Sequence, residues 1–144
     1  MRHDRPVNVL LVEDNPEDAE LTLRTLRRNN FSNPVEVVED GQEALDVLLR
    51  PGGFLDREGP RVILLDLKLP KVDGIEILRR LKADPRGRIT PVVILTSSQE
   101  ESDLMASYEL GASSFIVKPV DFEKFVESVT EIGMYWLLLN KAPA

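Results

Sequence analysis

Residues Val62–Pro70 of this 144-residue chain spell Val-Ile-Leu-Leu-Asp-Leu-Lys-Leu-Pro. The four consecutive apolar residues at its start are typical of a strand that is buried on both faces, as in a parallel sheet. Asp66 stands at the carboxyl end of that strand, where open parallel sheets bind their ligands and where an unpaired buried charge would be costly. Taken alone, Asp66 is explained more simply as the first residue of a solvated turn than as part of a binding site. The residues at the other strand ends must decide between these two interpretations.

Strand and helix patterns alternate through the rest of the chain. Four further apolar runs predict strands at Val7–Val12, Val35–Val38, Pro91–Leu95 and Phe115–Val117. Helical periodicity and capping residues predict helices at about 16–29, 42–49, 74–84, 99–110 and 122–132. Such alternation implies βαβ units, so we expect an α/β fold with a five-stranded, doubly wound parallel sheet in the order 2-1-3-4-5.

The chain is expected to form one domain, 1–144, with a core at about 7–132, a C-terminal helix extension at 133–144 and no output domain. Arg50–Arg61 is longer than the roughly 2–6 residues that usually join a helix to a strand in this architecture. This loop is either a tolerated insertion or a segment that contacts a partner, and the sequence leaves both open. The helix at 99–110 is weakly amphipathic, and we expect Leu104, Met105 and Tyr108 to face inward.

Composition excludes several classes of function. The net charge of −7 argues against a nucleic-acid binder and against adhesion to an anionic membrane. The chain has no cysteine, and its one histidine, His3, lies in a polar N-terminal stretch, so thiolate, disulfide and histidine-based chemistry are not expected. Because Met1–Pro6 lacks the apolar core of a signal peptide and no apolar run could span a membrane, we expect a cytoplasmic protein.

Ionisable and hydroxyl side chains follow the strands at one predicted edge. Strands one, three, four and five deliver Glu13 with Asp14, Asp66, Thr96 and Lys118 to that edge. Three carboxylates at close quarters repel one another unless a cation lies between them, and Mg²⁺, which prefers oxygen ligands, is the expected cofactor. Thr96 and Lys118 would complete a site for a phosphoryl group, with Asp66 as its nucleophile. Each residue alone also fits a plain surface role; their shared edge favours the functional interpretation.

Four motifs carry a resemblance to a known family. They are Leu11–Asn15, Leu65–Pro70 with Gly74, Leu95–Ser98 and Phe115–Pro119. They resemble the response regulator receiver domains of two-component signalling, over Val7 to about Ile132. With the long Arg50–Arg61 loop and the aromatic C-terminal segment, the chain is most similar to single-domain regulators paired with bacterial phytochrome kinases. The resemblance implies a sensor histidine kinase as partner, with a phytochrome kinase as one candidate.

The resemblance also implies a role for each residue at the edge. Asp66 is the expected phospho-acceptor, and the expected Mg²⁺ ligands are Asp14, Asp66, the backbone carbonyl of Lys68 and, through a water molecule, Glu13. Thr96 and Phe115 are the expected switch residues. Lys118 is expected to bind the phosphoryl group and to precede a cis Lys118–Pro119 bond. The protein would then be no enzyme beyond its own phosphoryl transfer and loss, and would signal by conformational switching.

Three other functions stay open. A flavodoxin-like cofactor binder would share the fold but would need a Gly/Ser/Thr-rich phosphate loop where this chain has the acidic turn at 13–18. A phosphatase with an aspartate nucleophile would pair Asp66 with a second carboxylate two residues on, where Lys68 stands. A phosphorylation-independent adaptor would not need the complete set of strand-end residues that this chain has.

The C-terminal segment Met134–Leu139 consists of six consecutive large apolar residues. One helix face cannot bury all of them against the sheet, because consecutive residues point around the whole circumference. Exposed apolar patches usually mark an interface. We therefore expect a two-fold homodimer through the last helix and this segment, with Tyr135, Trp136 and Leu138 in the interface. The alternative is that the segment folds back over the domain.

Overall fold

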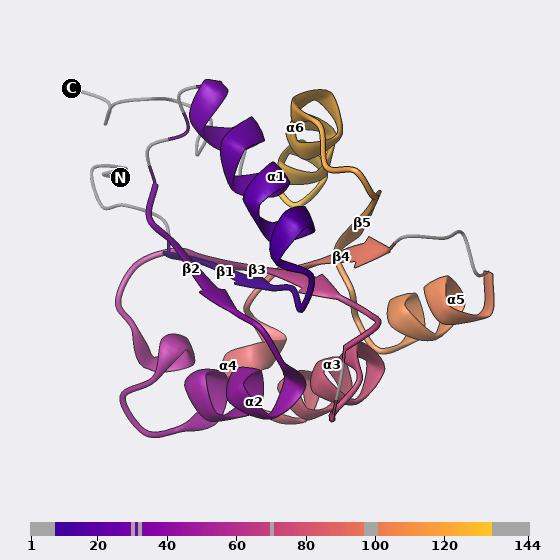
Figure 1. Cartoon of the computed structure of the whole chain (residues 1–144). Coiled ribbons are helices and arrows are strands. Elements are labelled where there is room, and N and C mark those ends of the chain that lie inside the picture. Colours follow the sequence, from indigo (N-terminus) through magenta and orange to yellow (C-terminus); the bar gives the residue numbers. More distant parts are fainter. Residues whose placement is uncertain (1–7, 30, 32, 70, 97–100, 134–144) are drawn as a thin grey trace.

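A single parallel sheet forms the centre of the protein (Figure 1). The computed structural model describes residues 8–133 except 30, 32, 70 and 97–100, and leaves the side chains of 101–104 undescribed. The sheet order is β2-β1-β3-β4-β5, as predicted. Its strands are β1 (Asn8–Val12), β2 (Val35–Val38), β3 (Arg61–Asp66), β4 (Val92–Thr96) and β5 (Ser114–Val117).

The register of the strands aligns their carboxyl ends. Val12 of β1 lies opposite Leu65 of β3, and Asp66 lies opposite Leu95 of β4. Thr96 in turn lies opposite Val117 of β5. Residues at or just after these positions therefore meet at one edge of the sheet.

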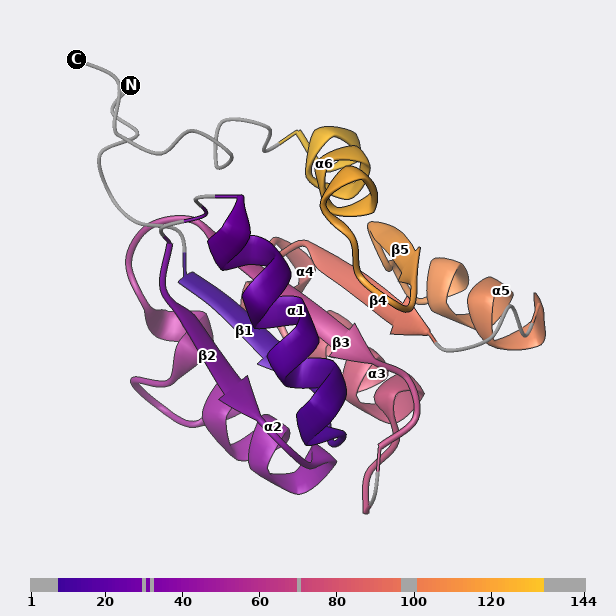
Figure 2. The same ribbon diagram turned by 45° about the horizontal axis from the view of Figure 1, so that its top comes forward.

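Helices cover both faces of the sheet (Figures 1 and 2). Helices α1 (Pro16–Arg28) and α6 (Phe122–Glu131) lie side by side on one face. The other face carries α2 (Gly41–Leu49), α3 (Gly74–Ala83) and α5 (Glu101–Glu109). This arrangement is the doubly wound architecture that the sequence predicts.

One short helix was not predicted. The sequence predicts a helix at about 74–84, and α3 does end at Ala83, but Pro85–Arg88 then forms the single-turn α4. Asp84 serves both helices, because its backbone N–H donates to Leu81 O and its side chain accepts the Arg86 N–H. A stop signal for one helix is here also a start signal for the next.

The apolar run of β3 alternates between two hydrophobic clusters. Val62 and Leu64 pack on the α1 and α6 side, whereas Ile63 and Leu65 pack on the α2 and α3 side. All four side chains are fully buried. Each burial contributes about 1.5–3 kcal/mol, so a strand that is covered on both faces needs an apolar residue at every position.

The loop Arg50–Arg61 is packed against the domain. It contains a 3₁₀ turn at Phe54–Asp56, and Phe54 and Leu55 are buried in the α2 and α3 cluster. Arg57 Nη2 contacts Glu36 Oε1 at 2.7 Å. The loop is thus part of the core, and its contact with a partner stays a hypothesis.

The prediction that Met105 and Tyr108 face inward on α5 is wrong. Met105 and Tyr108 are 57% and 53% exposed, whereas Ser107 is fully buried. Leu104 belongs to the side chains that the structure does not describe. Because α5 packs at the end of the sheet, its buried face includes a small residue in place of the large apolar ones.

No helix among the described residues is long and apolar enough to cross a membrane. Tyr135, Trp136 and Leu138, the predicted interface residues, lie outside the described residues.

Candidate functional site

Three carboxylates gather at the carboxyl edge of the sheet. Glu13 directly follows β1 and is 1% exposed, and Asp66 closes β3 at 4% exposure. Together with the exposed Asp14, they place one carboxylate oxygen each within 4.8 Å of one another. An all-oxygen group of this kind fits a hard divalent cation such as Mg²⁺.

Both carboxylate oxygens of Asp66 accept hydrogen bonds. Oδ1 accepts the Lys68 backbone N–H at 3.0 Å, and Oδ2 accepts from Lys118 Nζ at 2.8 Å. The turn after Asp66 is held by the Gly74 N–H, which donates to Leu67 O at 2.9 Å. A Cβ at Gly74 would lie 2.6 Å from Asp66 O, so glycine lets α3 begin directly against the candidate acceptor.

Lys118 places its ammonium among three carboxylates. Nζ lies 2.8 Å from Asp66 Oδ2, 2.7 Å from Glu13 Oε1 and 3.1 Å from Asp18 Oδ2, and the side chain is 13% exposed. Burial opposes the charged ammonium, but Asp66, Glu13 and Asp18 outweigh that cost and raise the pKa of Lys118. The predicted cis bond between Lys118 and Pro119 is confirmed.

Glu13 is held less completely than Asp66. Its Oε2 accepts the Asn15 N–H at 3.3 Å, whereas Oε1 has no hydrogen bond from the described residues and contacts Lys118 Nζ in a 2.7 Å ion pair. Burial and the nearby Asp66 raise the pKa of Glu13 to about 7 against the opposing effect of Lys118. A buried carboxylate with spare acceptor capacity supports the fit to a cation.

Asp18 also lies at this site, although the sequence patterns do not predict it there. It lies in the first turn of α1, where an acidic residue is explained by the positive end of the helix. Its ion pair with Lys118 joins two residues that are 100 positions apart. The local sequence carries no signal for such a contact.

The predicted switch residues lie on β4 and β5. Thr96 is 5% exposed, and its backbone O accepts the Lys118 N–H at 2.7 Å, which ties the two strand ends together. Phe115 packs against the α2 and α3 cluster. Its ring also contacts Tyr108 of α5, with centroids 4.3 Å apart and an angle of 67° between the planes. The aromatic pair thus links β5 to α5.

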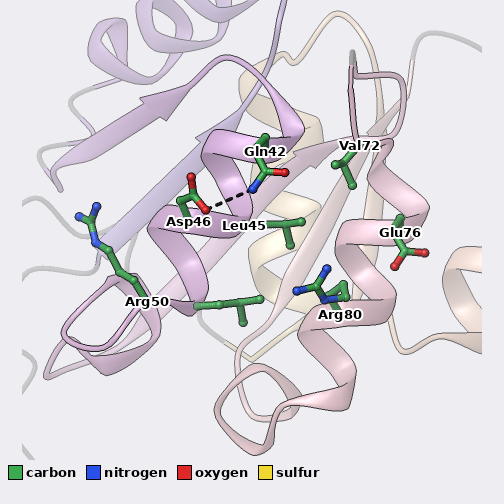
Figure 3. Close-up of a pocket in the computed structure, with 8 residues that line it drawn as sticks. Gln42, Leu45, Asp46, Arg50, Val72, Glu76 and Arg80 are labelled. Carbon is green, nitrogen blue, oxygen red and sulfur yellow. Dashed lines mark hydrogen bonds between the residues drawn. The ribbon is translucent and has the colours of Figure 1, made fainter.

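A separate groove of about 610 Å³ runs between α2 and α3 (Figure 3). Its lining includes Leu45 and Leu49 on one side and Val72 and Arg80 on the other. On α2, Gln42 Nε2 donates to Asp46 Oδ1 at 3.2 Å. None of the residues that form the carboxylate cluster lines this groove.

Two curated proteins are similar to nearly the whole chain. The probable methanogenesis regulatory protein FilR2 of Methanothrix harundinacea is 45% identical over 139 residues, which cover 96% of this chain and 88% of FilR2. The response regulator Rcp1 of Synechocystis sp. is 35% identical over 139 residues, which cover 96% of this chain and 95% of Rcp1.

Solved structures match the fold over a similar span. The bacteriophytochrome response regulator AtBRR is 50% identical with a TM-score of 0.81, covering 95% of this chain and 99% of AtBRR. The Mn²⁺-bound form of Rcp1 is 35% identical with a TM-score of 0.71, covering 96% and 100%. The phosphorylated cyanobacterial phytochrome response regulator RcpA is 35% identical with a TM-score of 0.75, covering 97% and 100%.

The model of one family spans most of the domain. Residues 9–130 match the response regulator receiver domain, and this range includes four strands completely and nearly all of β1 and α6. Fold, strand-end residues and similar structures agree with this match. The chain therefore belongs to the response regulator receiver domain family of two-component signalling, and its relatives include phytochrome-associated regulators.

Proposed function

We propose that the protein accepts a phosphoryl group on Asp66 from a sensor histidine kinase in a Mg²⁺-dependent reaction. The observation that carries this proposal is the contact of Lys118 with Asp66 beside the cluster of Glu13, Asp14 and Asp66. The Mn²⁺-bound form of Rcp1 and the phosphorylated form of RcpA support the proposal that this chain binds a divalent cation and accepts a phosphoryl group. AtBRR and RcpA make a phytochrome kinase the first candidate donor to test.

The transfer needs little chemistry from the protein. One Asp66 carboxylate oxygen bonds to phosphorus while the bond from phosphorus to the kinase histidine nitrogen breaks, and that nitrogen keeps the electron pair. Lys118 neutralises charge on the phosphoryl oxygens and holds the acceptor in place. Asp14, Asp66, the Lys68 carbonyl and, through a water molecule, Glu13 would hold Mg²⁺, which would supply further positive charge.

The signal would then pass through Thr96 and Phe115. A phosphoryl group offers strong acceptors for the Thr96 hydroxyl, and the Phe115 ring, packed on Tyr108, connects this strand edge to α5. The signal reaches a partner protein or a second copy of the chain. As part of this proposal, the chain forms a homodimer through α6 and the C-terminal segment.

The test is mass spectrometry of the intact protein after incubation with acetyl phosphate and Mg²⁺. The wild type and Asp46→Asn, an exposed aspartate of α2, should each gain one phosphoryl group, whereas Asp66→Asn should gain none. Excess chelator should suppress the gain in the wild type. An equal gain in Asp66→Asn, or a gain that the chelator leaves unchanged, would overturn the proposal. Turnover of a phosphate monoester would instead support an aspartate-nucleophile phosphatase.

A further inference from the structure

The three carboxylates around Lys118 come from different depths of the site. The Glu13 side chain is fully buried, that of Asp66 is 6% exposed, and that of Asp18 is 39% exposed. Glu13 and Asp66 belong to the cluster that could hold a metal ion, whereas Asp18 does not. Asp18 is therefore the one partner of Lys118 in this group that lies towards solvent and outside the metal cluster.

The backbone of Asp18 is held firmly at this position. Asn15 caps α1, and its Oδ1 accepts the N–H groups of Glu17 and Asp18 at 2.9 and 3.1 Å. The Ala19 N–H donates to Asn15 O at 3.0 Å, and Ala19 is buried. The hydrogen-bonded first turn of α1 thus fixes the backbone from which the Asp18 carboxylate contacts Lys118.

A helix N-terminus explains an acidic residue at position 18 but not its ion pair. Glu17 shares the same turn and the same favourable end of the helix, yet no ion pair involves it among the described residues. Asp18 differs because its oxygen lies 3.1 Å from the Lys118 ammonium. The single positive charge of Lys118 is shared among the carboxylates that lie within 3.1 Å of it, so its pairing with Asp18 leaves less of that charge for another anion.

We propose that Asp18 is a positioning residue that competes with a phosphoryl group on Asp66 for the Lys118 ammonium. The inference rests on the proposed function of Asp66. Without a phosphoryl group, the ammonium is divided between the buried carboxylates and Asp18. A phosphoryl group adds charge and acceptor oxygens to Asp66, and Lys118 must give up part of its pairing with Asp18 to meet them. Asp18 therefore opposes the phosphorylated state.

Removal of this competitor should strengthen binding of a phosphoryl analogue. The probe is beryllofluoride in the presence of Mg²⁺, with affinity measured by calorimetry on the full chain. Because Asp18 is partly exposed, we expect a moderate effect: Asp18→Asn should bind about two- to fivefold more tightly than the wild type. Asp18→Glu keeps the charge and should restore an affinity close to that of the wild type.

Glu17→Gln is the matched control, since it removes one charge from the same helix turn without removing an ion pair. It should leave the affinity within about twofold. In a Lys118→Ala background, Asp18→Asn should have no effect, because the residue acts through the lysine. Unchanged or weaker binding by Asp18→Asn, or an equal gain in Glu17→Gln, would overturn the inference.

A second measurement separates this inference from the proposed function. In the metal-free protein, the side-chain NMR signal of Lys118 should shift in Asp18→Asn and stay in place in Glu17→Gln. If the wild type neither binds beryllofluoride nor accepts a phosphoryl group, the proposed function fails while the shift still reports the ion pair. If the wild type binds and the Lys118 signal does not respond to Asp18→Asn, the inference alone fails.

Discussion

Glu13 is the most deeply buried carboxylate among the residues that the structure describes, at 1% exposure. Its position directly after β1 places it in the carboxylate cluster, where burial and Asp66 favour its neutral form. Lys118 favours the charged form but does not offset both effects. With a pKa of about 7 against an ordinary 4.5, Glu13 is the group at this site whose charge should change near neutral pH.

The first prediction concerns the effect of Glu13 on stability. Between pH 4.5 and about 7 the folded protein keeps a proton on Glu13 that the unfolded chain has released. The stability from this group is therefore complete below pH 4.5 and is lost as pH rises through 7, up to about 3 kcal/mol in all. Urea unfolding in chelator at pH 5 and pH 8 should show a larger loss in the wild type than in Glu13→Gln. Parallel losses in the two proteins would contradict the assigned pKa.

At the scale of elements, the Arg50–Arg61 loop shows how an irregular segment joins the core. Phe54 is fully buried, and the Arg57 guanidinium lies 5.3 Å from the centroid of its ring. Arg86 of α4 reaches back to Asp56 with a 2.8 Å contact. The loop therefore contacts α2, β2 and α4 through one aromatic anchor and a set of partly exposed ion pairs. The buried anchor contributes most of the stability.

Phe54→Ala should accordingly destabilise the domain by about 3–5 kcal/mol, because it leaves a cavity beneath the loop. Ile89→Ala, which truncates a side chain that is 75% exposed, should change stability by less than about 0.5 kcal/mol. Denaturant unfolding of both variants measures the difference. Similar, small losses in the two would mean that the loop is an insertion that the core does not need.

On the scale of the whole molecule, the site draws on both layers of helices. Asp18 comes from α1 on one face, and the turn after Asp66 leads into α3 on the other, while Lys118 follows the edge strand β5. On α6, Phe125 and Val129 already fill the core. The described residues of α6 therefore already supply its core face. The apolar residues of the C-terminal segment come in addition to that face.

The last prediction is that this segment mediates a two-fold dimer. At micromolar concentration, sedimentation should give the wild type a dimeric mass, and Trp136→Ala combined with Leu138→Glu should give a monomer, because the variant removes an aromatic anchor and buries a charge. Met105→Glu on the exposed face of α5 is the control and should stay dimeric. A monomeric wild type, or a dimeric double variant, would favour the alternative in which the segment folds back over its own domain.

Local sequence patterns predict the parallel sheet, the order of its strands and the five strand-end residues Glu13, Asp14, Asp66, Thr96 and Lys118. Buried parallel strands need continuous apolar runs, and helix ends need capping residues, so Val62–Leu65 and caps such as Asn15 and Asp73 carry the fold in local patterns. Because parallel strands present their carboxyl ends at one edge, Glu13 and Asp66 were predicted to meet without any knowledge of distances.

Local patterns do not predict which charges pair or which side chains become buried, because both depend on how the helices pack on the sheet. Asp18 contacts Lys118 across 100 positions, Phe54 reaches the core from an irregular loop, and Ser107 takes the inward place that Tyr108 was expected to fill. Periodicity reports which face of an element is apolar, but not which neighbour lies against it. Ion pairs and burial depend on distances between residues remote in sequence, and those distances exist only once the helices have packed on the sheet.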